Sequence, residues 1–178
     1  MSYIQDNLMP NEKVLFTARV HPAVFLPSVV SFVGSIAFVI YTMSTASKGD
    51  VTSGFFAIFL LPIAGMFFFS SIVLGLQALI VILTTEFGVT NRRVIAKTGF
   101  IRRHTLEMLL PKIESVSVNQ NVLGRMLNFG TVTVIGTGGT QGSFKSIIEP
   151  IEVRKKINRI IERYMQYQQN LSDKRAGG

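Results

Sequence analysis

Residues Phe55–Leu83 read FFAIFLLPIAGMFFFSSIVLGLQALIVIL, a run of 29 residues without a charged side chain. About 20 apolar residues suffice for a helix to cross a bilayer, so this run is long enough with residues to spare. The polar sequence TTEFGV follows directly, and from there the pattern changes to the alternation that is typical of strands. The run therefore predicts a membrane helix joined directly to a folded domain.

A second apolar run precedes it, Ala23–Met43, with 21 uncharged residues. A cleaved signal peptide is the rival interpretation, but signals have an apolar core of about 7–15 residues after a short basic region. The 22 residues before this run are not a short basic region, so we expect an uncleaved helix. The polar residues Ser44–Gly54 predict a short loop between antiparallel helices, and hence a transmembrane hairpin over residues 23–83.

Small residues recur along both predicted membrane helices. The pairs Ser31/Ser35 and Ser71/Gly75 have the small-xxx-small spacing that allows two helices to approach closely. Small residues are also common in membrane helices in general, and spacing alone does not separate the two interpretations. The candidate helix-packing residues are Ser31, Gly34, Ser35, Ser71 and Gly75.

Composition fits a membrane protein with a small soluble part, because 48% of the residues are hydrophobic and 16% are charged. The chain has no cysteine, which excludes disulfides and thiolate chemistry and fits a reducing compartment. Residues 1–83 carry three basic and three acidic side chains. Residues 84–178 carry fifteen and seven, so the whole net charge of +8 lies in that part.

The basic residues nearest the two apolar runs predict the topology. Lys13 and Arg19 precede the first run, and Arg92 and Arg93 follow the second, whereas the loop between them offers only Lys48. Cytoplasmic flanks are enriched in Lys and Arg. We therefore expect both termini in the cytoplasm and the loop outside.

Alternating segments outside the hairpin predict strands. Lys13–Val20 alternates apolar and polar residues, and we expect it to join the sheet formed after residue 84, because an unpaired strand would leave backbone groups exposed. Short strands separated by turns predict an antiparallel sandwich or barrel. The predicted strands after the hairpin are 86–90, 93–97, 101–110, 113–119, 131–137 and 143–148, with a short helical or irregular turn at Asn121–Asn128.

Pro150–Gln168 has apolar residues at the i, i+4, i+7 and i+8 spacing of an amphipathic helix, with proline suited to its first turn. The predicted apolar stripe consists of Val153, Ile157, Ile160, Ile161, Tyr164 and Tyr167 or Gln168. The remaining surface is basic, with Arg154, Lys155, Lys156, Arg159 and Arg163. We expect the helix to complete a domain over residues 84–169, and the polar residues 170–178 to form a frayed tail.

The stretch VTNRRVIAKTGFIRRHTLEMLLPKIESVSVNQNVLGRMLNFGTVTVIGTGG resembles the bacterial pleckstrin-homology (PH)-like domain of small two-helix membrane proteins. The N-terminal Pro10-Asn11-Glu12 and His21-Pro22 match the same proteins. The resemblance implies an α+β membrane protein: a transmembrane hairpin, and a PH-like antiparallel β-sandwich or barrel capped by the C-terminal helix. It also implies a cytoplasmic module anchored in the bacterial inner membrane. The other matching positions are Thr90, Asn91, Arg93, Gly99, Glu107, Ile113, Val116, Val118, Gln120, Gly124, Arg125, Gly130, Thr131 and Pro150.

The sequence contains few residues that could form a catalytic or metal-binding motif. The chain has two histidines, no cysteine and no H-E-x-x-H, and no serine stands in a G-x-S-x-G elbow. The glycine-rich stretch Gly136–Gly142 misses G-x-G-x-x-G by one residue and lies between two predicted strands, so it predicts a hairpin loop. We expect no catalytic residue, no metal site and no cofactor.

The basic residues form the one group of side chains for which the sequence indicates a binding mechanism. Those at the first hairpins of the predicted domain would attract anionic headgroups by about 1 kcal/mol each near a membrane surface. The alternative is that they only set the topology and lie on a solvated face. The candidate lipid-headgroup ligands are Arg92, Arg93, Lys97, Arg102 and Arg103.

Three function classes follow. A non-enzymatic, membrane-anchored interaction module or scaffold is favoured. It would bind protein partners, with a second copy of itself among them, and anionic phospholipid as a second ligand. An accessory subunit of a transport or channel complex is the alternative, although the predicted spans carry no charged residue. A nucleic-acid binder is not favoured, because the basic surface lacks interleaved aromatic residues.

Overall fold

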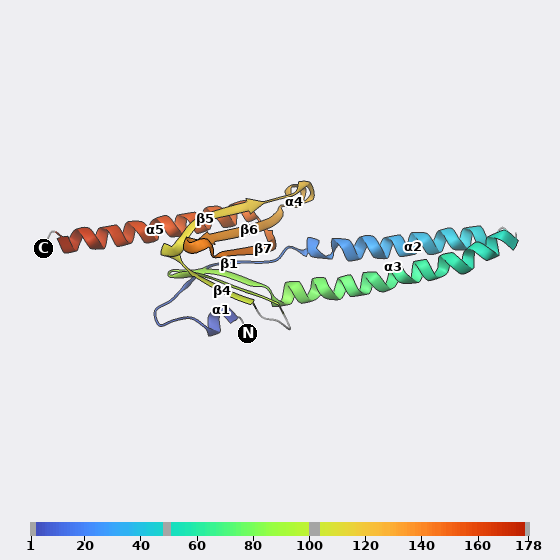
Figure 1. Cartoon of the computed structure of the whole chain (residues 1–178), viewed down its shortest axis with the longest axis horizontal. Helices are drawn as coiled ribbons and strands as arrows, with labels where there is room; N and C mark the ends of the chain where they lie inside the picture. Colours follow the sequence, from blue (N-terminus) through green and yellow to red (C-terminus); the bar gives the residue numbers. More distant parts are fainter. Residues whose placement is uncertain (1–2, 48–50, 100–103, 177–178) are drawn as a thin grey trace. The chain divides into compact units, whose positions relative to one another are not determined.

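The computed structural model describes residues 3–47, 51–99 and 104–176. The chain divides into two compact units, one made of Met1–Ala23 with Val81–Gly178 and the other of Val24–Ile80. The helical hairpin thus interrupts the first unit between its first two strands (Figure 1). Ala18, the last residue of the first strand, is the Cα partner of Phe87 in the second. The strand before the hairpin therefore pairs directly with the strand after it.

The first sheet is antiparallel and follows chain order. It consists of β1 (Val14–Ala18), β2 (Glu86–Thr90), β3 (Arg93–Thr98) and β4 (His104–Leu109). Successive strand residues point to opposite faces, and every second residue of β2 and β3 faces the core. The buried apolar side chains of this sheet in the core are Phe87, Val89, Val94, Ala96 and Met108.

The second sheet is also antiparallel, and contains β5 (Ile113–Asn119), β6 (Phe129–Gly136) and β7 (Gln141–Ile148). The short helix η2 (Leu110–Lys112) connects β4 to β5, and an isolated bridge pairs Val20 with Ile147. Within the described residues the two sheets do not close into a barrel, so of the two predicted forms the barrel is wrong. The strands pair within two separate sheets, and the C-terminal helix packs against the second of them and η2.

The C-terminal helix α5 (Pro150–Ala176) buries Val153 and Ile157 in the core between the sheets. This is the stripe that the helical spacing predicts. The helix continues to Ala176, although we expected a frayed tail from residue 170. No proline or glycine interrupts it before residue 177, and Lys174 and Arg175 in its last turn complement the helix dipole.

The connection between β5 and β6 contains the short helix α4 (Val122–Met126). The Asn121 side chain caps it by accepting a hydrogen bond of 2.7 Å from the Gly124 amide. The Gln120 side-chain amide donates to the carbonyl oxygen of Phe129 at 3.0 Å. A Cβ atom on Gly124 would lie 2.5 Å from that same oxygen, so only glycine lets α4 lie directly against the start of β6.

The second unit is the helical hairpin. It comprises α2 (Leu26–Ala46), which follows the 3₁₀ turn η1 (Pro22–Phe25), and most of α3 (Val51–Thr84). The helices are longer at the loop side than predicted, so the loop is shorter than Ser44–Gly54. Two helical segments, Pro22–Ala46 and Ile58–Thr84, are long and apolar enough to cross a membrane, and only 6% and 11% of their apolar windows are buried.

Small residues seven positions apart line the contact between the two helices, as in a coiled-coil seam. Small side chains let the helices approach closely. The hydroxyls of Ser28, Ser35 and Thr42 donate to carbonyl oxygens three residues earlier at 2.7–2.8 Å, so they are satisfied without a partner on α3. The seam residues are Ser28, Ser35 and Thr42 on α2, and Ala64, Ser71 and Ala78 on α3.

Candidate functional site

The members of the predicted basic cluster that the structure describes lie along β3 and do not form one group. Arg92 is exposed and precedes β3, whereas Lys97 lies near the other end of that strand, roughly 17 Å away at 3.3 Å per residue. Lys97 stands over the Tyr3 ring, with Nζ 4.7 Å from the ring centroid. Arg93 is only 5% exposed. Arg102 and Arg103 lie outside the described residues.

Arg93 has a different role from the predicted one, because its guanidinium group is enclosed by acids. Its Nε and Nη2 atoms donate to the two carboxylate oxygens of Glu12 at 3.0 and 2.9 Å. Its Nη1 atom donates to Glu107, and Nη2 also donates to the Asn7 carbonyl oxygen at 2.9 Å. The Thr90 hydroxyl donates to Glu12 at 2.7 Å. With these donors engaged, Arg93 anchors the N-terminal segment and is not available to a lipid headgroup.

The N-terminal segment covers the outer face of the first sheet. Its short helix α1 (Tyr3–Asp6), which no sequence pattern predicted, buries Ile4 over Gly88. A Cβ atom on Gly88 would lie 2.7 Å from the Ile4 side chain, so the absence of a side chain there creates the space for Ile4. The Ile4 amide donates to the Glu86 carboxylate at 3.3 Å. The segment is therefore part of the domain.

The Glu12 carboxylate makes the stability of this arrangement depend on pH. Burial by itself would raise the pKa of Glu12, but hydrogen bonds from Arg93, the Met9 amide and Thr90 outweigh it and lower the pKa below its ordinary value of 4.5. A group with a lowered pKa in the folded state contributes stability above its unfolded pKa and loses it as the pH falls. We expect the free energy of unfolding to fall as the pH drops below about 4.5.

Chemical denaturation of the full-length protein at several pH values, followed by tyrosine near-ultraviolet circular dichroism, measures this dependence. The Glu12→Gln variant lacks the titrating group. It should be less stable than wild type at neutral pH, and the difference should shrink in acid. A difference that stays constant from neutral to acidic pH would contradict the prediction.

The predicted helix-packing residues divide between the seam and the exposed surface of the hairpin. Ser35 and Ser71 are buried in the seam, and the Ser31 hydroxyl lies 2.6 Å from that of Ser70. A Cβ atom on Gly75 would lie 3.9 Å from Ser28, within ordinary contact distance. Gly34 is exposed, and a Cβ atom there would meet nothing within 4 Å.

The two histidines differ in their surroundings. The His21 ring stacks on Phe129 with centroids 5.3 Å apart, and its Nδ1 atom accepts a hydrogen bond of 2.9 Å from the Ala23 amide. His104 is exposed on β4. No group of three His, Cys, Asp or Glu side chains that could hold a metal ion occurs among the described residues.

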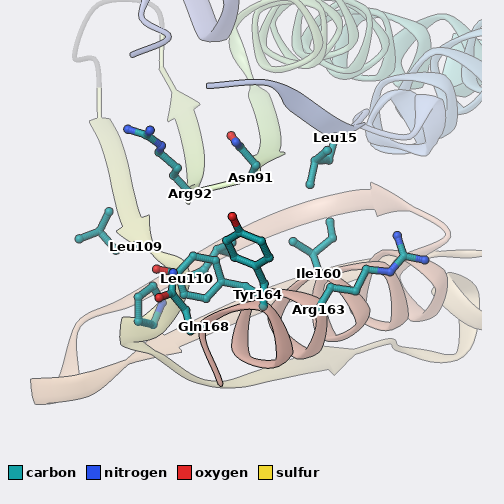
Figure 2. A pocket seen from close by; sticks show the side chains of 11 residues that line it. Leu15, Asn91, Arg92, Leu109, Leu110, Ile160, Arg163, Tyr164 and Gln168 are labelled. Carbon is teal, nitrogen blue, oxygen red and sulfur yellow. The ribbon is translucent and has the colours of Figure 1, made fainter. Parts of the chain in front are cut away.

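A groove of about 670 Å³ lies between the middle of α5, β1, the turn from β2 to β3, and η2 (Figure 2). Tyr164 rises from α5 toward Asn91, with Leu110 and Ile160 on either side of it. Arg92 and Arg163 lie on opposite sides of the groove in this view. The lining residues are Leu15, Asn91, Arg92, Leu109, Leu110, Pro111, Ile160, Arg163, Tyr164, Tyr167 and Gln168.

The chemistry of this groove is that of a binding surface for an anionic, partly apolar ligand. Five lining residues are apolar, four carry an amide or a phenol, two are arginines and none is acidic. Ligand sites combine an apolar lining with a few polar groups that orient the ligand, at volumes of about 300–1,000 Å³. The groove is therefore our candidate functional site.

The sequence analysis singled out several residues of this groove, but it placed them in separate groups. Arg92 belonged to the predicted basic cluster, and Tyr164 and Tyr167 to the predicted stripe of the last helix. Arg163 belonged to the basic face of that helix. The residues that line the groove come from as far apart in the chain as Leu15 and Gln168, and no local pattern indicates that they share a groove.

Comparisons with known proteins address the fold. Neither the curated proteins nor the solved structures contain a match to this chain. A family model described as "Bacterial PH domain" matches residues 24–165, which includes both helices of the hairpin, both sheets except β1, and more than half of α5. The match covers more than half of the chain and confirms the resemblance noted in the sequence. This chain belongs to the bacterial PH domain family.

Proposed function

We propose that this protein is a non-enzymatic, membrane-anchored PH-like interaction module that binds a protein partner on the cytoplasmic side of the membrane. The observation that carries the proposal is the insertion of two long, apolar and exposed helices into a domain of the bacterial PH family. Helices in the core of a soluble protein would be mostly buried. The insertion joins a binding module to a membrane anchor through two chain connections, one after β1 and one before β2.

The order of the elements supports an uncleaved anchor. β1 precedes the first apolar helix and pairs with β2, which follows the second. Cleavage after the first helix, as in a signal peptide, would remove an edge strand from the sheet, along with Glu12, the partner of Arg93. The first helix is therefore part of the folded protein.

Cysteine labelling in intact cells tests the topology, and the natural absence of cysteine makes single variants unambiguous. We expect a cysteine at Ser47, at the end of the hairpin, to react with an impermeant thiol reagent. A cysteine at Ser172 should react only after the cells are opened, because the positive flanks keep the domain in the cytoplasm. The reverse labelling pattern would contradict the topology.

We assign the partner-binding surface to the groove beside α5. A protein segment that carries apolar side chains and a carboxylate would fit this groove. Its apolar side chains would contact the leucines of the groove, and its carboxylate would pair with the arginines. Four uncharged hydrogen-bonding side chains among the apolar ones suit a peptide backbone better than an acyl chain. Because the net charge is +8, a second copy of this chain is a poor occupant of the groove. A second copy is better placed as a partner of the exposed hairpin surface.

Selection of displayed random peptides on the full-length protein in lipid nanodiscs tests this assignment. We expect enrichment of peptides that combine Asp or Glu with large apolar residues. Arg163→Glu should weaken their binding at least about tenfold, because a hydrogen bond to a charged group contributes about 1.5–3 kcal/mol. Arg159→Glu is the matched control, since it makes the same charge change at an exposed position of α5 outside the groove.

A charge exchange completes the test. Selected peptides with Lys in place of their acidic residue should bind the Arg163→Glu variant better than the wild type. Equal losses in the Arg163 and Arg159 variants would remove the groove as the binding surface. Equal losses would point instead to diffuse attraction between the acidic peptide and the basic protein surface as a whole. Anionic phospholipid would be attracted to that surface in the same way.

A further inference from the structure

The connection between β5 and β6 exposes an apolar surface, the α4 patch, defined as Val122, Leu123, Met126 and Leu127. These side chains are 77%, 50%, 77% and 44% exposed, respectively. Positions four apart on a helix are neighbours, so Val122 lies beside Met126, and Leu123 beside Leu127 at the end of the helix. Gly124, on the other side of α4, is buried against the domain. Contiguous exposed apolar side chains mark an interaction surface, whereas single ones do not.

Contacts within the domain connect the α4 patch to the point where the chain enters the hairpin. Gly124 lies against the carbonyl group of Phe129, and the Phe129 ring stacks on His21. His21 is held to β7 by its amide, which donates to the Ser146 carbonyl oxygen at 2.6 Å. The next residue, Pro22, is the first residue of the apolar segment Pro22–Ala46. Two contacts therefore separate the α4 patch from the start of the first candidate span.

We propose that the α4 patch inserts into the headgroup boundary of the bilayer that the hairpin crosses. The inference rests on the proposed membrane anchor and goes beyond it. A short amphipathic helix beside a membrane entry gains by moving its apolar side chains out of water and into this boundary. The exposed Arg125 on α4 can extend to anionic headgroups while the apolar residues insert.

Insertion would give the domain a third attachment to the membrane. Of the two chain connections, one leaves the domain beside β7, where the His21 amide donates to Ser146, and the other returns to it at the start of β2. A contact through α4, on the connection between β5 and β6, would attach a different part of the domain and restrain its rotation relative to the bilayer. The bilayer would then fix which face of the domain a cytoplasmic partner meets.

Nitroxide labels on single cysteines of the full-length protein measure this insertion in nanodiscs of phosphatidylcholine and phosphatidylglycerol. The labels replace Met126 in the α4 patch, Ile36 on the exposed surface of α2, and Ser172 near the end of α5. We expect the labels at Met126 and Ile36 to collide more with oxygen, which concentrates in lipid, than with a water-soluble nickel chelate. The label at Ser172 should show the opposite preference.

The Ile36 label separates failure of this inference from failure of the anchor. Lipid contact at Ile36 with water contact at Met126 would overturn the inference and leave the anchor standing. Water contact at both positions would overturn both. A Met126 label that is immobilised but shielded from both oxygen and nickel would indicate a protein contact, and would also overturn the inference.

A second variant tests the apolar chemistry of the α4 patch. Val122→Asp should return the Met126 label to water, because a carboxylate opposes insertion of the same face. Met165→Asp, which places the same charge at an exposed apolar position of α5, should leave that label in lipid. Both substituted side chains are exposed, so the fold should tolerate them, and unchanged thermal unfolding would verify this. A Met126 label that keeps its lipid contact in the Val122 variant would contradict insertion of the patch.

Discussion

Replacing Arg93 with alanine is expected to lower the free energy of unfolding of the domain by about 3–5 kcal/mol, because removal of one partner leaves a buried charge uncompensated. The Glu12 side chain is fully buried and receives two hydrogen bonds from the guanidinium group. Arg93 also holds the Asn7 carbonyl oxygen. Its loss should therefore release the N-terminal segment as well as weaken the sheet.

Urea denaturation of the full-length protein in detergent, followed by near-ultraviolet circular dichroism of its tyrosines, measures the loss. Arg92→Ala is the matched control. It removes the neighbouring, exposed arginine and should change stability by no more than about 0.5 kcal/mol. The double variant Glu12→Ala/Arg93→Ala should be less destabilised than the sum of the single variants, because neither charge is then left alone. Additive effects, or equal effects of Arg92 and Arg93, would show that the ion pair is not coupled as described.

Replacing Phe87 with alanine is expected to cost about 3–5 kcal/mol, because it removes a large buried side chain and leaves a cavity. Phe87 is 1% exposed, and its ring lies against Phe144 of the second sheet with centroids 4.7 Å apart. It therefore joins the two sheets across the core. It is also the third residue after α3, so the core begins directly where the chain returns from the hairpin.

The same denaturation experiment measures this effect, with two comparisons. Phe87→Leu should cost less than Phe87→Ala, because it keeps part of the buried volume. Leu15→Ala, on the neighbouring strand β1, removes a side chain that is mostly exposed, and should have a small effect. If Leu15→Ala costs as much as Phe87→Ala, the core does not lie where the structure places it.

Local patterns account for the elements that could be predicted. Uncharged length predicts the two apolar helices, because a bilayer accepts only long apolar segments. Alternation with period two predicts β1 and the later strands, and the stripe of Val153 and Ile157 predicts α5. The order of these elements, with the spacing of residues such as Gly124 and Gly130, carries the resemblance to the bacterial PH family. Apart from the order of the elements, each of these signals lies within one continuous segment of the chain.

The burial of Arg93 is a feature that local sequence patterns do not predict. From sequence alone an arginine is predicted to lie at the surface, because burying an unpaired charge costs free energy. Arg93 is buried because Glu12, 81 positions earlier, supplies two carboxylate oxygens at the right place. Helix α1 depends on a long-range contact of its own, because Ile4 is buried over Gly88 of β2.

The sequence by itself determined the apolar hairpin, most of the strands and helices, and the family, because side-chain periodicity and length are properties of continuous segments. Only the tertiary structure decided that the hairpin interrupts a sheet between β1 and β2, and that the two sheets do not close. It also joined Leu15, Arg92 and Tyr164 in one groove, and left the α4 patch exposed. These features depend on which distant segments pair, and pairing is decided by burial and hydrogen bonding over the whole domain.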